Sequence, residues 1–205
     1  MRSGDAAKET RLDKNPLVLL ELVERLGNLM RSELRKAGAD ETLQPVHLQA
    51  LIYLTKANRY SNTPQALADY LGLTKGTVSQ TLLLLDRRGL VERFEDEIDR
   101  RVVRLRLSSA GEQLLAESQP ALAWQNATRN ISPNRIRNAT SALREALVTL
   151  QEDNEGTVFG ACTTCAYCQK LSQRVYRCGQ MGDRLSAPET RRLCRIYVAK
   201  ADEAA

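Results

Sequence analysis

The sequence predicts a mainly α-helical protein with one small β-hairpin and a short cysteine-rich C-terminal extension. Three observations support this prediction. Between residues 17 and 152, apolar residues recur at spacings of three and four, the period of one helix face. Two partly alternating runs, 90–94 and 102–107, flank a charged segment, a pattern typical of a hairpin. All five cysteines lie after residue 160, so they mark a separate feature of the chain.

Composition narrows the class of protein. With 205 residues, of which 42% are hydrophobic, the chain can bury a core. Lys and Arg outnumber Asp and Glu by 30 to 25, and the net charge of +5 favours polyanionic partners. Residues 1–16 lack the apolar run of a secretory signal, and no stretch approaches the roughly 18 apolar residues of a membrane span. We therefore expect a cytoplasmic protein without membrane contact, in which cysteines form a local thiolate site rather than disulfides.

The first two helices follow from periodicity and stop signals. Residues 17–37 carry leucines on one face, and Gly38 supplies the stop. Pro45 suits the first turn of a second helix, which the segment 60–62 ends. Its inward residues are expected to be Leu48, Leu51, Ile52 and Tyr53.

The next two helices are short and close together. Thr63 followed by Pro64 has the form of an N-cap and a first helical residue, and Gly72 closes that helix. Thr74 then caps the next helix, which ends at Gly89. Its inward residues recur at helical spacing, namely Val78, Leu82 and Leu85. Two short helices joined by a glycine-containing turn form a helix-turn-helix.

The remaining elements are a hairpin and further helices. The strands 90–94 and 102–107 form a hairpin with a long polar tip at 95–101. Ser109 and Glu112 form a capping box that starts another helix, which Pro120 is expected to kink. A last long helix starts at Ser132-Pro133 and fades at 154–156.

Residues 17–152 resemble the MarR family of bacterial regulators. The most specific stretch reads LADYLGLTKGTVSQTLLLLDRRGLVERFEDEIDRRVVRLRLSSAGEQL, which is similar to the family's recognition helix, hairpin and exit helix. The resemblance implies a winged helix-turn-helix fold, in which the hairpin is the wing. We accordingly divide the chain into a flexible arm (1–16), a MarR-like DNA-binding and dimerisation domain (17–152) and a cysteine-rich tail (153–205).

The resemblance also implies which residues contact DNA. A recognition helix presents its N-terminal half to base edges in the major groove. Gln80 and Lys75 are candidate base readers, because Gln pairs with adenine and Lys with guanine. The candidates for phosphate contacts are Thr74, Thr77 and Ser79. At the wing tip the resemblance implies that Arg100 and Arg101 insert into the minor groove, with Asp99 orienting one of them. The alternative is a solvated charged turn. For Arg87 and Arg88 the explanation without DNA is stronger, because basic residues near a helix C-terminus are favoured by the helix dipole.

A homodimer follows from surplus apolar surface. The first helix and the helices after residue 109 have apolar faces that one winged-helix core cannot cover. A two-fold dimer covers them and places two recognition helices about 34 to 36 Å apart, so the expected partner is double-stranded, pseudo-palindromic operator DNA. Trp124 is assigned to the core rather than to the wall of a ligand pocket.

The tail has the pattern Cys162-x2-Cys165-x2-Cys168-x9-Cys178-x15-Cys194. A Cys-x2-Cys pair followed by further cysteines can bring four thiolates to one centre. The single histidine, His47, is distant in sequence and is not expected to be a ligand. A subset of MarR-like regulators carries a similar tail, and this resemblance implies Cys162, Cys165, Cys178 and Cys194 as ligands, with Cys168 as an alternative.

The sequence leaves three possibilities for this site: an iron–sulfur cluster, a structural Zn²⁺ ion, or a thiol switch without a metal. The zinc-ribbon pattern fits less well, because fifteen residues separate the last two cysteines and a helix is expected to begin near Pro188. An iron–sulfur cluster is preferred, since a redox-labile centre would give the regulator an input. Basic residues crowd the tail and either neutralise the thiolates or form a solvated face; they are Lys170, Arg174, Arg177, Arg184, Arg191, Arg192 and Arg195.

The sequence therefore predicts a transcriptional regulator, most simply a repressor, whose cysteine centre senses redox state, iron or a reactive small molecule. The alternative is a regulator with a purely structural zinc site and a small-molecule ligand. A thiol–disulfide redox enzyme using Cys162 and Cys165 is a weaker alternative, because no strand-helix-strand unit surrounds that pair. We expect no enzyme, since no catalytic triad, phosphate loop or carboxylate pair is evident.

Overall fold

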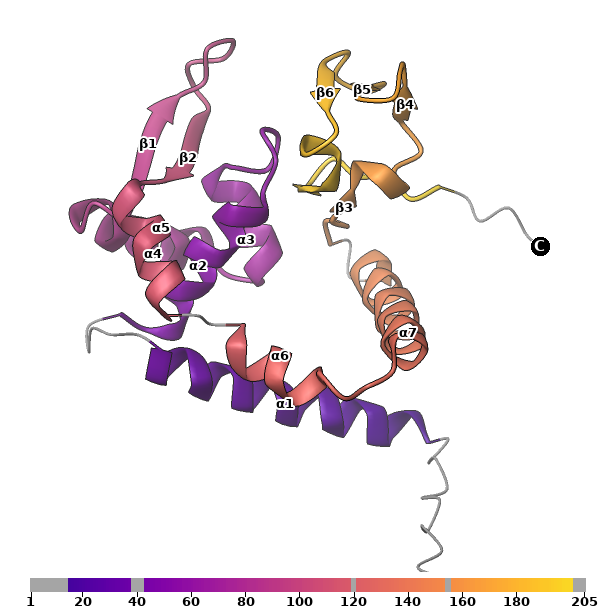
Figure 1. Ribbon diagram of the computed structural model, residues 1–205. Coiled ribbons are helices and arrows are strands. Elements are labelled where there is room, and N and C mark those ends of the chain that lie inside the picture. The colour runs from indigo at the N-terminus through magenta and orange to yellow at the C-terminus, as the bar shows by residue number, and fades with distance from the viewer. Residues whose placement is uncertain (1–14, 38–42, 119–120, 154–155, 201–205) are drawn as a thin grey trace, which may run out of the picture.

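The computed structural model describes residues 15–37, 43–118, 121–153 and 156–200. Figure 1 shows a helical part that carries the wing, and beside it a smaller part built from short strands. The helical part consists of α1 (Pro16–Ala37), α2 (Pro45–Lys56), α3 (Pro64–Leu71), α4 (Lys75–Arg87), β1 (Val91–Glu95), β2 (Val103–Leu107), α5 (Ser109–Ser118), α6 (Leu122–Thr128) and α7 (Pro133–Asp153). The predictions for the arm 1–14, Gly38, Pro120 and 154–155 lie outside the described residues.

The core of the helical part lies around α2. Leu48, Leu51 and Tyr53 are almost completely buried there, as the apolar pattern predicts, while Ile52 is partly buried against the same cluster. The inward faces of α3, α4 and the wing complete the cluster with Leu67, Val78, Leu82, Leu85 and Leu105. Each buried leucine contributes about 1.5–3 kcal/mol through removal of apolar surface from water. This core fixes the positions of α4 and the wing.

The helix ends of the helix-turn-helix confirm the predicted caps. The Thr63 hydroxyl accepts a hydrogen bond from Ala66 N at 3.2 Å, and Thr74 accepts one from Thr77 N at 3.2 Å. Gly72 closes α3 in the left-handed conformation, with φ of 64°. Glycine tolerates this conformation because it has no Cβ. The sharp turn between α3 and α4 is thus encoded locally.

The cap of α5 differs from the prediction by one residue. The hydroxyl of Ser108, not Ser109, accepts the hydrogen bond from Gly111 N at 3.1 Å, while Ser108 O accepts from Glu112 N at 3.0 Å. The capping box assigned to Ser109 and Glu112 is therefore wrong. Ser108 is the cap because its hydroxyl also donates to Gly89 O, which joins the start of α5 to the end of α4.

The wing is an antiparallel pair, as expected. Strand β1 pairs with β2 in a register that joins Val91 to Leu107 and Glu95 to Val103. Leu105 is buried in the core, whereas of its two neighbours Arg106 is exposed and Arg104 is half-buried, which fits a strand with one buried face. The wing therefore presents basic side chains on its solvent face.

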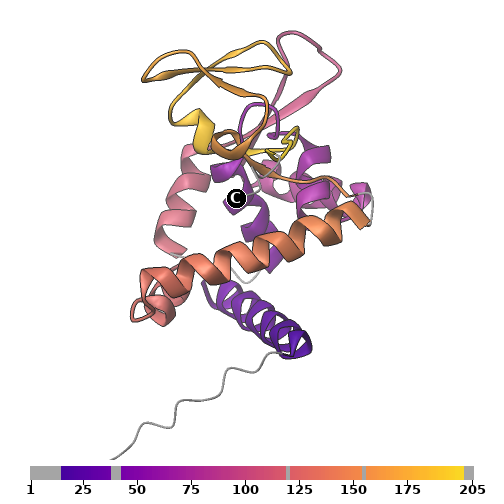
Figure 2. The ribbon, with the colours of Figure 1, turned by 90° about the vertical axis from the view of Figure 1, so that its right-hand side faces the viewer.

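The helices α1, α6 and α7 keep exposed apolar faces. Figure 2 shows α7 running across the molecule between the strand-rich part and α1. Their exposed apolar residues include Leu19, Leu22, Leu26, Leu29, Ile136, Leu143, Leu147 and Leu150. Trp124 of α6 is 44% exposed, so its assignment to the core is wrong for the single chain: no residue of this short helix is buried. Among the described residues, no helix combines the length and apolar character needed to span a bilayer.

The cysteine-rich part consists of short strands and single helical turns. It contains β3 (Gly160–Ala161), η1 (Cys162–Thr164), β4 (Cys168–Lys170), β5 (Val175–Cys178), β6 (Arg184–Ser186), η2 (Glu189–Arg191) and β7 (Leu193–Cys194). Strands β4, β5 and β6 form an antiparallel meander, and β3 pairs with β7. Gly160 is required in β3 because the Tyr197 ring lies 2.6 Å from where a Cβ would stand.

The prediction that a helix begins near Pro188 is wrong. Only one 3₁₀ turn, η2, forms, and Cys194 lies in the extended strand β7. The physical reason is long-range pairing: Leu193 pairs with Ala161 in β3, and its carbonyl accepts a hydrogen bond from Asn58 N at 2.9 Å. These partners hold the backbone extended where its local pattern would allow a helix.

Candidate nucleic-acid interface and cysteine centre

The exposed face of α4 carries all of the predicted recognition residues. Lys75, Thr77, Ser79 and Gln80 are exposed, whereas Val78 between them is buried. No acidic residue lies in the first turn of α4. The helix N-terminus therefore keeps its partial positive charge, which favours a phosphate nearby. Thr74 is exposed as well, although its hydroxyl also contacts the hydroxyl of Thr77 at 2.9 Å.

The wing tip is organised by Asp96, which the sequence pattern does not single out. Its carboxylate accepts hydrogen bonds from Asp99 N and Ile98 N, both at 2.9 Å, and from Arg104 Nε at 2.7 Å. The backbone N–H of Asp99, that of Ile98 and the Arg104 guanidinium together lower the pKa of Asp96 to about 2. The carboxylate is therefore charged at neutral pH and holds the turn.

The arginines of the tip are presented to solvent. Arg101 forms a two-point ion pair with Asp99, from Nε at 3.0 Å and Nη2 at 3.1 Å, which confirms the predicted orienting role of Asp99. The Arg101 guanidinium lowers the pKa of Asp99. The Arg101 side chain remains 91% exposed, and Arg100 is exposed too. An exposed guanidinium held by one carboxylate keeps free N–H donors for a second anion.

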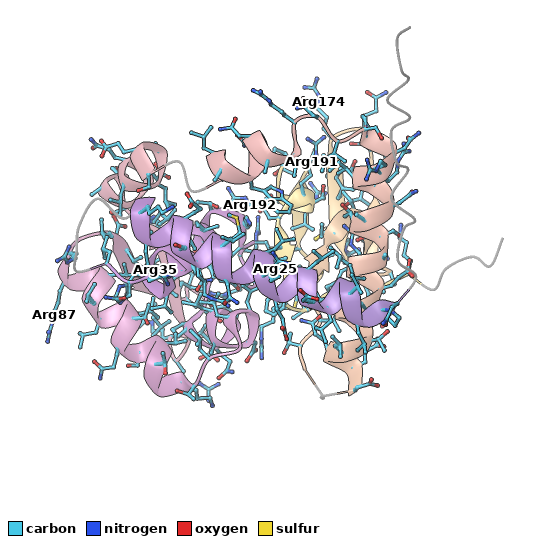
Figure 3. The ribbon with its side chains drawn as sticks, turned by 90° about the horizontal axis from the view of Figure 1, so that it is seen from below. Arg25, Arg35, Arg87, Arg174, Arg191 and Arg192 are labelled. Atoms are coloured by element: carbon cyan, nitrogen blue, oxygen red, sulfur yellow. The ribbon has the colours of Figure 1, made fainter. Side chains whose placement is uncertain are left out.

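A concave surface that encloses a volume of about 570 Å³ lies between α4 and the wing. Its lining includes Lys75 and Ser79 from α4 and Arg101 and Arg104 from the wing. Two other predicted residues, Thr77 and Gln80, line a second hollow on the far side of α4 together with Arg87 and Arg88. Figure 3 shows Arg87 projecting from the edge of the molecule. The predicted residues therefore cover both sides of one exposed helix.

In the tail, the four predicted ligand cysteines are all buried. Their exposed fractions are 5% for Cys162, 7% for Cys165, 8% for Cys178 and 3% for Cys194. Interaction with Cys194 and then burial raise the pKa of Cys162, whereas interaction with Cys162 lowers the pKa of Cys194. The pairing of β3 with β7 brings the segments that carry Cys162 and Cys194 side by side.

The other cysteines lie close to this pair. Cys165 N donates to Cys162 O at 3.1 Å, which closes a tight turn between them. Cys168 of β4 stands directly opposite Cys178 of β5. Directly opposed residues of antiparallel strands point to the same face. Cys168 is half-buried, and burial raises its pKa. Its position beside Cys178 makes it suitable as the alternative ligand.

The thiols are gathered but do not form a preassembled metal site. Across residues 15–37, 43–118, 121–153 and 156–200, no group of three or more His, Cys, Asp or Glu side chains is arranged so that it could hold a metal ion. His47 is buried in α2 and accepts a hydrogen bond from Gln44 N at 2.9 Å, so it serves the helix start. Most of the tail's basic residues are exposed, which favours the solvated face; these are Lys170, Arg174, Arg177, Arg184, Arg191 and Arg192.

The tail docks on the loop between α2 and α3, residues 57–62, which we call the docking loop. Asn58 N donates to Leu193 O, and Arg195 N donates to Ser61 Oγ at 2.8 Å. Tyr60 OH donates to Asp183 Oδ2 at 2.7 Å. These contacts flank Cys194 on both sides.

The docking is reinforced by two ion pairs. Arg195 Nε contacts Asp69 Oδ2 of α3 at 2.7 Å, and Arg59 pairs with Glu189. On its other side the docking loop contacts the wing: Leu105 N donates to Asn62 O at 2.8 Å, and Arg104 Nη1 donates to Asn62 Oδ1 at 3.2 Å. The loop therefore lies between the cysteines and the wing.

Comparisons with known proteins find relatives of the helical part. Residues 42–102 match the family model described as MarR family. The transcriptional repressor MprA of Escherichia coli K12 is 34% identical over 100 residues, which cover 49% of this chain and 52% of MprA. Over these residues the chain is similar to the MarR family. It matches only about half the length of this curated relative.

Solved structures support the same fold. CouR from Rhodococcus jostii RHA1, bound to p-coumaroyl-CoA, has a TM-score of 0.55 at 19% identity and covers 62% of this chain and 90% of its own. The MepR–DNA complex of S. aureus has a TM-score of 0.53 at 20% identity, with coverage of 63% and 96%. FabT of Streptococcus pneumoniae, in complex with DNA, has a TM-score of 0.52 at 21% identity, with coverage of 67% and 97%. At such identities the likeness shows the winged-helix fold.

The cysteines lie outside the matched MarR segment, which ends at residue 102. The docking loop lies inside it. Sequence reasoning identifies this loop only as a helix stop and misses its contacts with the tail. The one local signal is its content of polar residues at 58–62, which is ordinary for a loop.

Proposed function

We propose that this MarR-like chain is a homodimeric transcriptional repressor that binds double-stranded operator DNA. We also propose that its cysteine centre holds an iron–sulfur cluster, through which the protein senses redox state, iron supply or a reactive small molecule. The single observation that supports DNA binding best is the basic concave surface between α4 and the wing, with Lys75 on one side and Arg101 on the other.

The geometry suits a duplex. An exposed helix such as α4 fits the major groove, where Gln80 and Lys75 would read base edges and the hydroxyls of Thr74, Thr77 and Ser79 would contact phosphates. The tip arginines, Arg100 and Arg101, suit a neighbouring minor groove, whose negative potential is deepest in narrow A·T tracts. The DNA complexes of MepR and FabT share this fold.

Dimer formation is supported by the exposed apolar faces of α1 and α7. Leu29 is 62% exposed and Leu147 is 55% exposed in the single chain, within stripes of similar residues. Exposed stripes of this length are covered in most soluble proteins, and a two-fold axis would cover both at once. We expect Leu143→Glu with Leu147→Glu to turn a dimer into monomers in light scattering, whereas Arg144→Glu on the same helix leaves a dimer.

The iron–sulfur proposal is supported by the donor set. Four buried thiols lie within one small unit, in η1, β5, β7 and the turn after η1, and all-cysteine ligation is the commonest way to hold such clusters. When bound, the cluster would supply a centre that gains or loses an electron or is destroyed by oxidants. Loss of the centre would release the tail from the docking loop and so alter the spacing of the two recognition helices.

The DNA part is tested with duplexes selected by the wild-type protein from a random pool. Lys75→Glu with Arg101→Glu should lower affinity at least ~10-fold and reduce the dependence of log K on log salt by about 0.9 for each phosphate that the protein no longer neutralises. Arg35→Glu with Lys56→Glu makes the same change of charge away from the concave surface and should leave affinity near wild type. Unchanged binding of the first pair at low salt would overturn the proposal.

The cluster is tested on anaerobically purified full-length protein. Iron and acid-labile sulfide, together with a brown colour, support the cluster; zinc alone would replace it with the structural-zinc alternative, and neither would leave a bare thiol centre. The sensing part is tested by gel shift before and after removal of the centre. Equal affinity for DNA in the two states would refute sensing.

A further inference from the structure

The concave surface between α4 and the wing also extends to the cysteine-rich tail. Arg195, which follows β7, lines this surface together with Lys75 of α4 and Arg101 of the wing. In both Figure 1 and Figure 2, the strands of the tail and the wing lie on the side of the molecule away from α1. The surface that supports DNA binding is therefore formed by both parts of the chain.

The charged side chains that line this surface are all of one sign. The described residues of the lining include five basic side chains and no acidic one. The basic residues are Lys75, Arg93, Arg101, Arg104 and Arg195. A cleft lined by charge of one sign concentrates ions of the opposite sign. The backbone of a DNA duplex, which carries one negative charge per phosphate, is such a partner.

Arg195 is held in the same way as the arginine of the wing tip. Its Nε donates to Asp69 Oδ2 at 2.7 Å, and its side chain is 36% exposed. The ion pair of Arg101 with Asp99 has the same character. A guanidinium carries five N–H donors, so that a bond from Nε to one carboxylate leaves donors for a second anion. Asp69 therefore orients the Arg195 side chain and does not exhaust it.

The backbone around Arg195 is fixed by the docking loop. Arg195 N donates to Ser61 Oγ at 2.8 Å, and Leu193 O accepts a hydrogen bond from Asn58 N at 2.9 Å. Tyr60 of the same loop lines the concave surface beside Arg195. A side chain that is already positioned loses little conformational freedom when it binds a partner. Arg195 is thus prepared for contact with an anion in this surface.

We propose that Arg195 binds a backbone phosphate of the operator duplex, so that the docked tail is part of the DNA interface. This inference rests on the proposed function, because it requires that the protein binds DNA through α4 and the wing. It does not depend on what the cysteines hold. Phosphate contacts carry no direct sequence information, so Arg195 adds affinity and not sequence preference.

The contact gives the tail a direct influence on DNA affinity. Release of the tail from the docking loop would withdraw one positive charge per subunit from the concave surface. Operator binding would then weaken even if the two recognition helices kept their spacing.

The test measures the affinity of the full-length protein for a selected duplex and for a random duplex over a range of salt concentrations. Arg195→Gln should lower affinity for both duplexes about 10-fold. It should also reduce the dependence of log K on log salt by about 0.9 for each phosphate that is no longer neutralised. Arg195→Lys keeps the positive charge and should restore most of that dependence.

Arg174→Gln is the matched control within the tail. Arg174, labelled in Figure 3, is exposed and does not belong to the lining of the concave surface. Its replacement removes the same charge from the tail and should leave affinity and salt dependence at wild-type values. A decrease equal to that of Arg195→Gln would show an effect of net charge alone and would overturn the inference.

Asp69→Asn separates a phosphate contact from a purely structural role. It breaks the same ion pair as Arg195→Gln but keeps the cation, so the salt dependence should stay at the wild-type value or above it. If the wild-type protein binds DNA and the two variants lose salt dependence equally, or Arg195→Gln loses none, this inference alone is overturned. A wild-type protein that binds neither duplex would overturn the proposed function itself.

Discussion

The winged-helix part and the cysteine-rich tail are held together by different forces. The winged helix buries a continuous cluster of leucines, alanines and valines around α2 and α4. The buried cluster of the tail is made of Cys162, Cys178 and Leu185. Small units that cannot bury enough apolar surface need a staple, such as a metal or disulfides. The comparison indicates that the tail relies on its contacts with the docking loop and, under the proposed function, on what its thiols would bind.

The largest effect should come from disrupting the cysteine centre. If the proposed centre holds a metal, its chelation or Cys194→Ser should expose the tail, because metal binding and folding are coupled in small metal-held units. Hydrogen exchange should then become fast across 160–199 while α2 and α4 stay protected. Cys168→Ser is the matched control and should retain protection, since Cys168 is the half-buried alternative ligand. Loss of protection in α2 as well would show that the two regions unfold as one.

A substitution in the leucine cluster should instead destabilise the winged-helix part, and the matching substitution in the tail should not. Leu82 is 1% exposed at the centre of the leucine cluster, and Leu82→Ala should destabilise the main unfolding transition by about 2–5 kcal/mol in urea denaturation. Leu185→Ala removes the same atoms from the tail, where Leu185 is 4% exposed, and should leave that transition nearly unchanged. Equal decreases in the two variants would contradict the division into two regions.

The sequence predicts the winged helix better than the tail because the signals there are local. The caps at Thr63 and Thr74 and the left-handed Gly72 lie within a few residues of the groups that they satisfy. The same holds for the pairing of Asp99 with Arg101, two residues away. Locally encoded features of this kind can be inferred from one sequence.

The tail's strand β7 and its docking cannot be predicted in this way. Arg195 and Ser61 are 134 residues apart, and Arg195 and Asp69 are 126 apart. A short window of sequence does not include both partners of such a pair. The local pattern after Pro188 therefore favours a helix that does not form. The contact from Asn58 N to Leu193 O escapes prediction for the same reason, because the two residues lie far apart along the chain.

The ion pair that joins the two regions should have a smaller effect. Arg195 and Asp69 have side chains that are 36% and 17% exposed, so their attraction is only partly screened by water. We expect Asp69→Asn to weaken docking by about 1 kcal/mol, seen as faster hydrogen exchange in β7. Glu21→Gln breaks the exposed pair with Arg25 in α1 and should not change hydrogen exchange in β7. Unaltered exchange in β7 of Asp69→Asn would show that the docking loop alone holds the tail.

The smallest effect is a pH dependence confined to the winged helix. Burial, and then the positive charge of Arg88, lower the pKa of His47 below its ordinary value of 6.5. The unfolded chain therefore binds a proton at His47 in the pH range just below 6.5, where the folded chain does not. Stability must fall as the pH drops through this range, because the unfolded state takes up more protons.

His47→Gln should flatten this dependence, because the Gln side-chain oxygen can still accept the hydrogen bond from Gln44 N but does not titrate. Urea denaturation at pH 7 and pH 5.5 measures the difference for both proteins, above the range in which most carboxylates titrate. The wild-type protein should lose more unfolding free energy than the variant between these two values. Because His47 belongs to the leucine-held region, hydrogen exchange in the tail should not follow the same pH dependence; if it does, protonation of His47 is felt through the docking loop and the two regions are more tightly coupled than their separate cores suggest.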